Sequence, residues 1–239
     1  MKSFAKKVEV PSCEKCRNFN HSSFCSLNKT EQYQFSEHKS FNLYKKGQVI
    51  FYEGNQPQGL YCIYSGKVKI HKLGDDGKDQ IVRLAKTGNI IGYRALLSAD
   101  NYYATATALE NTFVCFFPKA IYLNLLMNNP EFAMETIKML SGNLRNAEQM
   151  ITNMAQKQVR ERMAGALLFL KDFFGLEDDS ATINTVMTRQ DIGNIAGTTT
   201  ETSIRVLSDF NKNKIIRIVG KKIKILNKKE LSRIANIAE

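Results

Sequence analysis

Two kinds of hydrophobic periodicity divide the chain. Between about residues 40 and 118, short runs rich in β-branched and aromatic residues, such as GQVIFYEG and GLYCIYSGKVKIHKL, are separated by glycines. Many short strands at this spacing predict a β-sandwich or jelly roll. The segment GDDGK (74–78) is typical of a hairpin turn between two of these strands.

The period then changes to that of a long helix, which we expect to begin at Pro130 because proline is favoured in the first helical turn. Its apolar residues recur at alternating steps of three and four, as in a coiled-coil seam. This seam consists of Ile137, Leu140, Leu144, Ala147, Ile151 and Met154. Polar residues flank it, so it is narrower than the stripe of a helix packed on its own domain. We favour a contact between two copies of the chain, parallel or antiparallel, over packing against its own β domain.

A second helical region is predicted from about Gln156 to Phe174, and it is ended by Gly175 and the acidic segment LEDDS. The remainder, 181–239, reads as a compact helix-rich unit with one hairpin. The predicted class is therefore α+β. The predicted segments are 1–30, bearing cysteines, 31–128, a β roll, 129–155, a dimerisation helix, and 156–239, the helix-rich part that includes the hairpin.

Two short helices within the last segment predict a helix-turn-helix. Thr188 and Asp191 resemble a capping box at the start of the first helix, and Gly197 supplies the tight turn that ends it. Thr198 and Glu201 predict a second capping box. The second helix carries an apolar set formed by Ile204, Val206, Leu207 and Phe210.

The second helix is the candidate for reading DNA, since recognition helices place their N-terminal residues at base edges. Glu201 and Arg205 are four residues apart and share one face. Arginine binds guanine O6 and N7 together, and glutamate accepts from cytosine N4. The alternative to a DNA-reading role is that Glu201 and Arg205 form an exposed ion pair on an ordinary helical hairpin. The candidate DNA-binding residues are Arg189, Thr198, Thr199, Thr200, Glu201, Ser203, Arg205, Lys221 and Lys222.

A basic segment follows, because every charged residue from 211 to 229 is Lys or Arg. IIRIVGKKIKIL alternates apolar and basic residues around Gly220-Lys221, which predicts a β-hairpin with a cationic outer face. A helix that reads bases beside a cationic hairpin is typical of a winged helix-turn-helix. In such a domain, phosphate contacts supply affinity and base contacts determine which DNA sequence is bound.

The 239-residue chain has a net charge of +11, which favours binding to a polyanionic partner. No apolar run approaches the ~20 residues of a membrane span, and MKSFAKKVEVP lacks the apolar core of a signal peptide. We expect a cytoplasmic protein that does not enter membranes. The 3 histidines are dispersed and no hydrolase or Walker motif occurs, so catalysis is not expected. The 5 cysteines are odd in number, which fits a disulfide framework poorly.

The order of β roll, long helix and winged helix-turn-helix resembles the CRP/FNR family of bacterial transcription regulators. The most specific part is MTRQDIGNIAGTTTETSIRVLSDF, in which Glu201 and Arg205 match the E-x-x-x-R pair that the family uses for a G·C pair. The resemblance implies a homodimer on palindromic double-stranded DNA, with RNA polymerase as a partner if the protein is an activator. Ile204 stands where the FNR branch commonly has serine, and it would suit a thymine methyl group.

A cyclic nucleotide is not expected in the β roll, although a cyclic-nucleotide-binding regulatory subunit that acts on a protein partner remains the less favoured alternative. The cyclic-AMP branch of the family has glycine-glutamate and arginine-serine pairs where this chain has Gly92-Tyr93 and Tyr103-Ala104. A cyclic phosphate would meet no cation at Tyr103-Ala104, and Arg94 is out of place for it.

The resemblance gives the cysteines a role as ligands of a [4Fe–4S] cluster. The oxygen-sensing FNR branch uses three N-terminal cysteines and a fourth in a V-C-x-x-P context, which FVCFFP reproduces here. The implied ligands are Cys13, Cys16, Cys25 and Cys115, and the implied signal is oxygen or redox state. Zinc, a thiol switch and no ligand remain alternatives. Cys62 is interpreted as a core residue.

The sequence departs from the oxygen-sensing branch at two points. Eight residues separate Cys16 from Cys25, which is a wider gap than is usual in the oxygen-sensing branch. Ala147 stands in the seam where the oxygen-sensing members have an acidic residue. We therefore expect the seam to pair without a cluster, and cluster binding either to tune domain orientation or to matter little.

Overall fold

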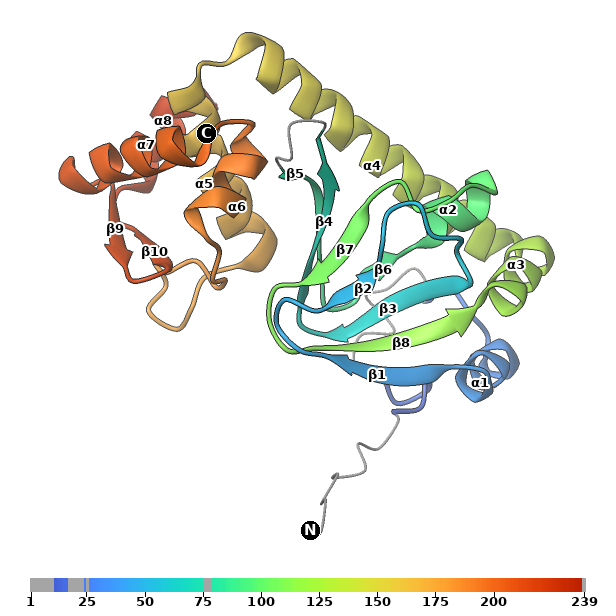
Figure 1. The fold of residues 1–239 in the computed structure, drawn as a ribbon. Helices are drawn as coiled ribbons and strands as arrows, with labels where there is room; N and C mark the ends of the chain where they lie inside the picture. Colours follow the sequence, from blue (N-terminus) through green and yellow to red (C-terminus); the bar gives the residue numbers. More distant parts are fainter. Residues whose placement is uncertain (1–10, 17–23, 25, 75–78, 238–239) are drawn as a thin grey trace, which may run out of the picture. The chain divides into compact units, whose positions relative to one another are not determined.

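The computed structural model describes residues 11–16, 24, 26–74 and 79–237 (Figure 1). They form two compact units, one within residues 1–70 and 84–141 and the other within 71–83 and 142–239. The boundary between the units falls inside the long helix, between Ser141 and Gly142. The four-segment division drawn from the sequence stays a prediction.

Residues 40–118 form a β roll, as expected, and most of it belongs to the first unit, while residues 71–83 are grouped with the second. One sheet has the order β1-β8-β3-β6 and the other has the order β2-β7-β4-β5. Strands β4 and β5 are neighbours, as the hairpin at GDDGK predicts, but residues 75–78 of that turn lie outside the described part of the chain. The strands are β1 (Ser40–Tyr44), β2 (Val49–Phe51), β3 (Gly59–Ser65), β4 (Lys67–Leu73), β5 (Asp79–Lys86), β6 (Ile90–Ile91), β7 (Thr105–Ala108) and β8 (Thr112–Pro118).

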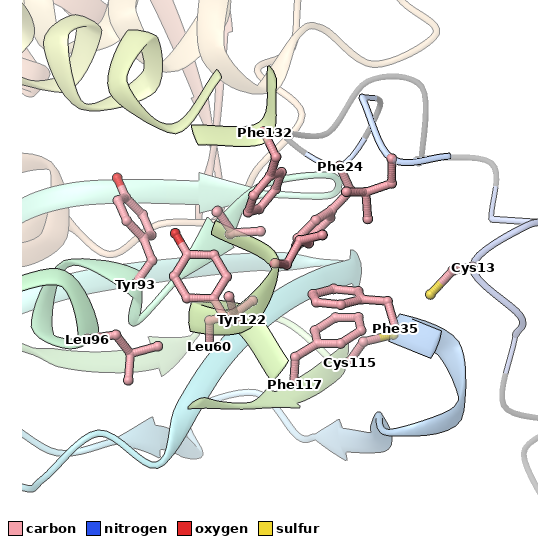
Figure 2. Packing of buried hydrophobic residues seen from close by; sticks show 13 residues of the cluster. Cys13, Phe24, Phe35, Leu60, Tyr93, Leu96, Cys115, Phe117, Tyr122 and Phe132 are labelled. Carbon is pink, nitrogen blue, oxygen red and sulfur yellow. The ribbon is translucent and has the colours of Figure 1, made fainter. Parts of the chain in front are cut away.

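Helices cover one end of this roll and close its aromatic core. They are α1 (Lys29–Glu37), α2 (Tyr93–Ser98), α3 (Lys119–Asn128) and the beginning of α4 (Pro130–Gln156). The ring of Phe35 from α1 stacks on Phe117 from β8, with centroids 3.9 Å apart. Phe24 packs on both and on Phe132 of α4, at centroid distances of 4.9, 5.6 and 5.7 Å (Figure 2). The cluster joins residue 24 and α1 to the roll.

Helix α4 begins at Pro130, as predicted. The side-chain oxygen of Asn129 accepts a hydrogen bond from the backbone N–H of Phe132 at 2.9 Å. This bond satisfies one of the backbone N–H groups of the first turn that have no acceptor within the helix. Phe132 and Thr136 are the buried residues of the helix, and Phe132 packs in the aromatic core of the roll. The helix is 27 residues long in total.

The second unit contains the helix-turn-helix and the hairpin (Figure 1). Helix α5 begins at Val159, three residues later than predicted, and the Glu161 carboxylate in its first turn accepts a hydrogen bond from the Gln158 N–H at 2.6 Å. No helix in the described residues is long and apolar enough to cross a membrane. The elements of this unit are α5 (Val159–Phe174), α6 (Arg189–Ala196), α7 (Thr200–Lys212), β9 (Ile216–Val219), β10 (Lys222–Ile225) and α8 (Lys228–Ile234).

Candidate DNA-binding surface and cysteine site

The first helix of the motif starts and stops where the sequence predicts. The Thr188 hydroxyl accepts from the Asp191 N–H at 3.0 Å, and the Asp191 carboxylate accepts from the Thr188 N–H at 3.1 Å. Gly197 ends α6 with a left-handed φ of 62°. A Cβ at this position would also lie 3.0 Å from the terminal carbon of Met154, so both the backbone conformation and the available space favour glycine at the turn.

The start of the second helix differs from the prediction. Thr199, not Thr198, is the N-cap, and its hydroxyl accepts from the Thr202 N–H at 3.3 Å. Thr198 belongs to the turn, because its N–H donates to the Gly193 oxygen at 2.9 Å. The predicted capping box of Thr198 and Glu201 is therefore wrong. The backbone N–H groups at the start of α7 still lie next to Thr198, Thr199 and Thr200.

Helix α7 has one buried and one exposed face. The buried residues are Ser203, Val206, Leu207 and Phe210. The exposed residues Glu201, Ile204, Arg205 and Ser208 follow the i, i+3, i+4, i+7 spacing of a single helical face. Ile204 is 49% exposed, so the prediction that it belongs to the apolar set of this helix is wrong. Glu201, Ile204 and Arg205 together form the candidate face for reading DNA, called the reading face below.

Ser203 lies on the inner face of α7, where its side chain is not accessible to a partner. It is fully buried, and its hydroxyl donates to the backbone oxygen of Arg189 at 2.8 Å. Its place in the predicted DNA-binding set is therefore corrected to a bond between α6 and α7. Arg189 is half-buried and donates to the Gly220 oxygen at 3.1 Å, which connects α6 to the turn of the hairpin. Burial lowers the pKa of the Arg189 guanidinium.

The hairpin β9–β10 has the alternation that the sequence predicts. Ile216, Ile223 and Ile225 are buried, while the basic residues between them are exposed or half-buried. Lys221 is exposed and forms no ion pair among the described residues. Lys222, in contrast, is paired with Glu177 at 2.6 Å.

The carboxylate of Glu177 could not be assigned this role from the sequence, where the acidic segment after α5 indicates only the end of a helix. Glu177 lies far before Lys222 in the chain, and no local pattern pairs them. The stretch from 211 to 229 contains no acid, but this does not exclude a partner from elsewhere in the chain.

Two of the predicted metal ligands belong to one hydrophobic cluster of the first unit. Cys13 and Cys115 are both buried in the aromatic cluster that contains Phe35 and Phe117 (Figure 2). Cys62 packs against the same cluster and lies directly opposite Cys115 in the β3–β8 ladder. The interpretation of Cys62 as a core residue agrees with this position. Cys16 is half-buried, and Cys25 lies outside the described residues.

The electrostatic environment favours neutral thiols at the two strand positions. Burial raises the pKa of Cys115 to about 12 and also raises the pKa of Cys62. The ammonium of Lys39 acts in the opposite direction on both. Lys39 also approaches the Cys13 sulfur to 3.3 Å and donates to the Pro11 oxygen. Segment 11–13 is thereby held beside α1, where the Cys13 N–H donates to Ser36 at 3.2 Å.

The chemistry of these donors suits an iron–sulfur cluster or zinc, since both take four thiolates. Within the residues that the structure describes, however, no group of three or more Cys, His, Asp or Glu side chains is gathered closely enough to hold a metal ion. The three described candidates, Cys13, Cys16 and Cys115, are therefore not gathered into a metal site in this structure.

Among the positions compared with the cyclic-AMP branch, Gly92 lies against aromatic side chains. A Cβ on Gly92 would lie 3.4 Å from Tyr61 and 3.5 Å from Tyr102. Tyr93 is fully buried and Ala104 is buried, while Tyr103 is exposed. None of these four positions carries a cationic side chain.

The predicted seam of α4 is uncovered in the single chain. Ile137, Leu144 and Ile151, spaced by seven residues, are 53%, 61% and 68% exposed. Ala147 and Met154 are also exposed, and Leu140 packs partly against the aromatic cluster. Exposed apolar side chains that recur along one helical face mark an interaction surface.

Comparison with known proteins agrees with this architecture. Residues 41–129 match the cyclic nucleotide-binding domain family and residues 161–234 match the Crp-like helix-turn-helix domain family. The chain is 31% identical over 244 aligned positions to the fumarate and nitrate reduction regulatory protein of Vibrio cholerae, covering 100% of this chain and 97% of that protein. It is 31% identical over 192 residues to the protein of the same name from Escherichia coli K12, covering 80% and 76%.

Solved structures show the same fold. FixK2 from Bradyrhizobium japonicum superposes with a TM-score of 0.74 at 26% identity, covering 84% of this chain and 99% of that one. A CRP/FNR transcriptional regulator from Thermus thermophilus gives a TM-score of 0.70 at 25% identity, covering 82% and 98%. The two curated relatives are named as regulatory proteins, and the Thermus protein is a transcriptional regulator of the CRP/FNR family. This chain belongs to the CRP/FNR family of transcription regulators.

Proposed function

We propose that the protein binds a palindromic DNA site as a homodimer and selects the sequence through Glu201 and Arg205. The observation that carries this proposal is the reading face of α7, on which both side chains are exposed four residues apart. Arg205 would bond O6 and N7 of a guanine, and Glu201 would accept from N4 of a cytosine. Ile204, exposed between them, would contact a thymine methyl group.

Affinity would come from contacts to the phosphates on either side of this face. The first turn of α7 offers backbone N–H groups and the hydroxyl groups of Thr198 and Thr200, while Thr199 already uses its oxygen as a cap. Lys221, at the tip of the hairpin, would add a cation that no described acid neutralises. Such contacts carry no sequence information, so they determine how tightly the protein binds DNA but not which sequence it selects.

Dimerisation would use the exposed seam of α4. A two-fold dimer presents two recognition helices, so its half-sites should lie about one helical turn, ~34 Å, apart. If the protein is an activator, it would also contact RNA polymerase once it is placed on its site.

Site selection from a random duplex library tests the DNA-binding proposal. The wild type should enrich a palindrome, and Arg205→Ala should lose discrimination at one G·C pair by about 1–3 kcal/mol. Lys221→Ala is the matched control, because loss of a phosphate contact weakens all sequences alike. If Arg205→Ala enriched the same sequence as the wild type, the reading face would be wrongly assigned.

We further infer that Cys13, Cys16, Cys25 and Cys115 hold a [4Fe–4S] cluster that makes the regulator responsive to oxygen or redox state. Support comes from the thiol donors, from the burial of Cys13 and Cys115 in one cluster, and from the similarity to fumarate and nitrate reduction regulatory proteins. When bound, such a cluster supplies a redox-active centre. The ligands would then connect the N-terminal segment to β8, ahead of the dimerisation helix. No cyclic nucleotide is proposed as a ligand.

A further inference from the structure

The β9–β10 hairpin is called the wing here. The loop formed by residues 176–183, called the acidic loop, is fixed alongside it. The Ile183 N–H donates to the Ile223 oxygen at 2.9 Å, and the Ile225 N–H donates to the Ala181 oxygen at 2.9 Å. The acidic loop thus continues the hairpin on the β10 side. Its side chains are held in place relative to those of β10 by main-chain bonds.

Two lysines of β10 are paired with carboxylates of this loop. Lys222 binds Glu177 at 2.6 Å and Lys224 binds Asp179 at 3.1 Å. Asp179 also accepts from the N–H groups of Ala181 and Thr182, at 3.0 and 2.8 Å, and from the Thr182 hydroxyl at 2.7 Å. These hydrogen bonds lower the pKa of Asp179, so it stays ionised at neutral pH.

The cations of the wing therefore fall into two groups. Lys222 and Lys224 have carboxylate partners, whereas Arg217 and Lys221 are exposed and have no ion pair within the described residues. Lys222, Lys224 and Arg217 line one surface hollow of about 310 Å³ together with Glu177 and Asp179. A DNA phosphate that approached this hollow would meet two acids among the three cations.

We propose that the acidic loop is an internal competitor for DNA phosphate at the wing: Glu177 and Asp179 keep Lys222 and Lys224 from binding the DNA backbone, and they lower affinity for non-specific DNA. This inference rests on the proposed binding of DNA by the wing and specifies which of its cations take part. Because phosphate contacts supply nearly all non-specific binding, removing two of them raises the relative weight of base contacts on α7.

Glu177→Gln is the cleaner test, since Asp179 also holds the loop in shape. Full-length protein is titrated with a fluorescein-labelled duplex of mixed sequence between about 50 and 200 mM KCl. Glu177→Gln should bind more tightly and steepen the plot of log affinity against log salt by about 0.9 for each phosphate gained. Asp178→Asn is the matched control. It removes the same charge from the same loop, but Asp178 is exposed and forms no ion pair in the described structure.

Lys222→Gln completes a double-mutant cycle. It should leave the salt slope unchanged in the wild type and reverse the gain in the Glu177→Gln background. Thermal melting by circular dichroism verifies that each variant is folded. An unchanged slope in Glu177→Gln, or an equal change in Asp178→Asn, would overturn the inference while wild-type binding still supports the proposed function. A wild type that does not retain DNA at low salt would overturn both.

Discussion

The hydroxyl of Ser203 donates a 2.8 Å hydrogen bond to the backbone oxygen of Arg189, and this bond joins the two helices of the helix-turn-helix. Arg189 in turn donates to the Gly220 oxygen at the turn of the wing. One chain of contacts thus runs from α7 through α6 to the hairpin. It directs the opposite face of α7, with Glu201 and Arg205, to solvent.

Replacement of Ser203 by alanine should therefore affect stability and not the choice of sequence. The change leaves a carbonyl oxygen without its buried donor, and we expect a loss of about 1 kcal/mol in the free energy of unfolding. Urea denaturation measures it, with Ser208→Ala on the exposed face as the control that should change little. Altered sequence selection by a Ser203→Ala protein of normal stability would show that Ser203 contacts DNA after all.

The seam of α4 makes a second prediction. Ala147→Asp places two like charges at the centre of the proposed dimer contact, where they lose water without gaining partners. The dimer dissociation constant should rise by about 100-fold, as roughly 3 kcal/mol of unpaired-charge cost implies. Sedimentation equilibrium at micromolar concentration measures it.

Asn146→Asp adds the same charge one residue away, outside the seam, and should leave the dimer intact. Equal weakening by both variants would point to net charge and not to the seam. A wild type that is monomeric under these conditions would refute the dimer contact itself.

The third prediction concerns the aromatic cluster. Phe24 is buried against Phe35, Phe117 and Phe132, and it directly precedes Cys25 in the sequence. Phe24→Ala should cost about 3–5 kcal/mol, since the cavity adds to the lost burial. Tyr33→Ala, on the exposed side of α1, should cost less than about 0.5 kcal/mol. Equal loss of stability in urea denaturation for the two variants would mean that residue 24 does not anchor this segment.

Local patterns in the sequence predicted the fold where a local cause decides it. The capping box at Thr188, the turn at Gly197 and the start of α4 at Pro130 each depend on residues within a few positions, and each is confirmed. The predicted cap at the start of α7 is misplaced by one residue because three threonines in a row offer equivalent hydroxyl groups. The hydrogen bond from Thr198 to Gly193 in the preceding helix decides between them.

Features that depend on distant residues could not be predicted from the sequence. Ser203 and Ile204 are adjacent on a helix, and only the position of α6 decides that the serine is buried and the isoleucine exposed. The pairing of Lys222 with Glu177 likewise requires the acidic loop to dock on β10. Cys62 lies opposite Cys115 because β3 and β8, which are far apart in the chain, pair in that particular register.

The fourth prediction separates these two cysteines. They share one rung of the β3–β8 ladder and one hydrophobic cluster, so serine at either position removes a thiol from nearly the same surroundings. Only Cys115 belongs to the proposed ligand set. In protein purified without air and reconstituted with iron and sulfide, Cys115→Ser should lack the visible absorbance and the iron content of the wild type, because a hydroxyl is a poor substitute for a soft thiolate ligand. Cys62→Ser should retain both.

The same samples decide among the alternatives for the metal. Zinc in the purified wild type without iron or sulfide would favour a structural thiolate site. Loss of the cluster in Cys62→Ser as well as Cys115→Ser would mean that packing of this rung, and not ligation, controls cluster retention. A colourless and iron-free wild type that binds DNA normally would refute the cluster and leave the DNA-binding proposal intact, because the reading face of α7 contains no cysteine.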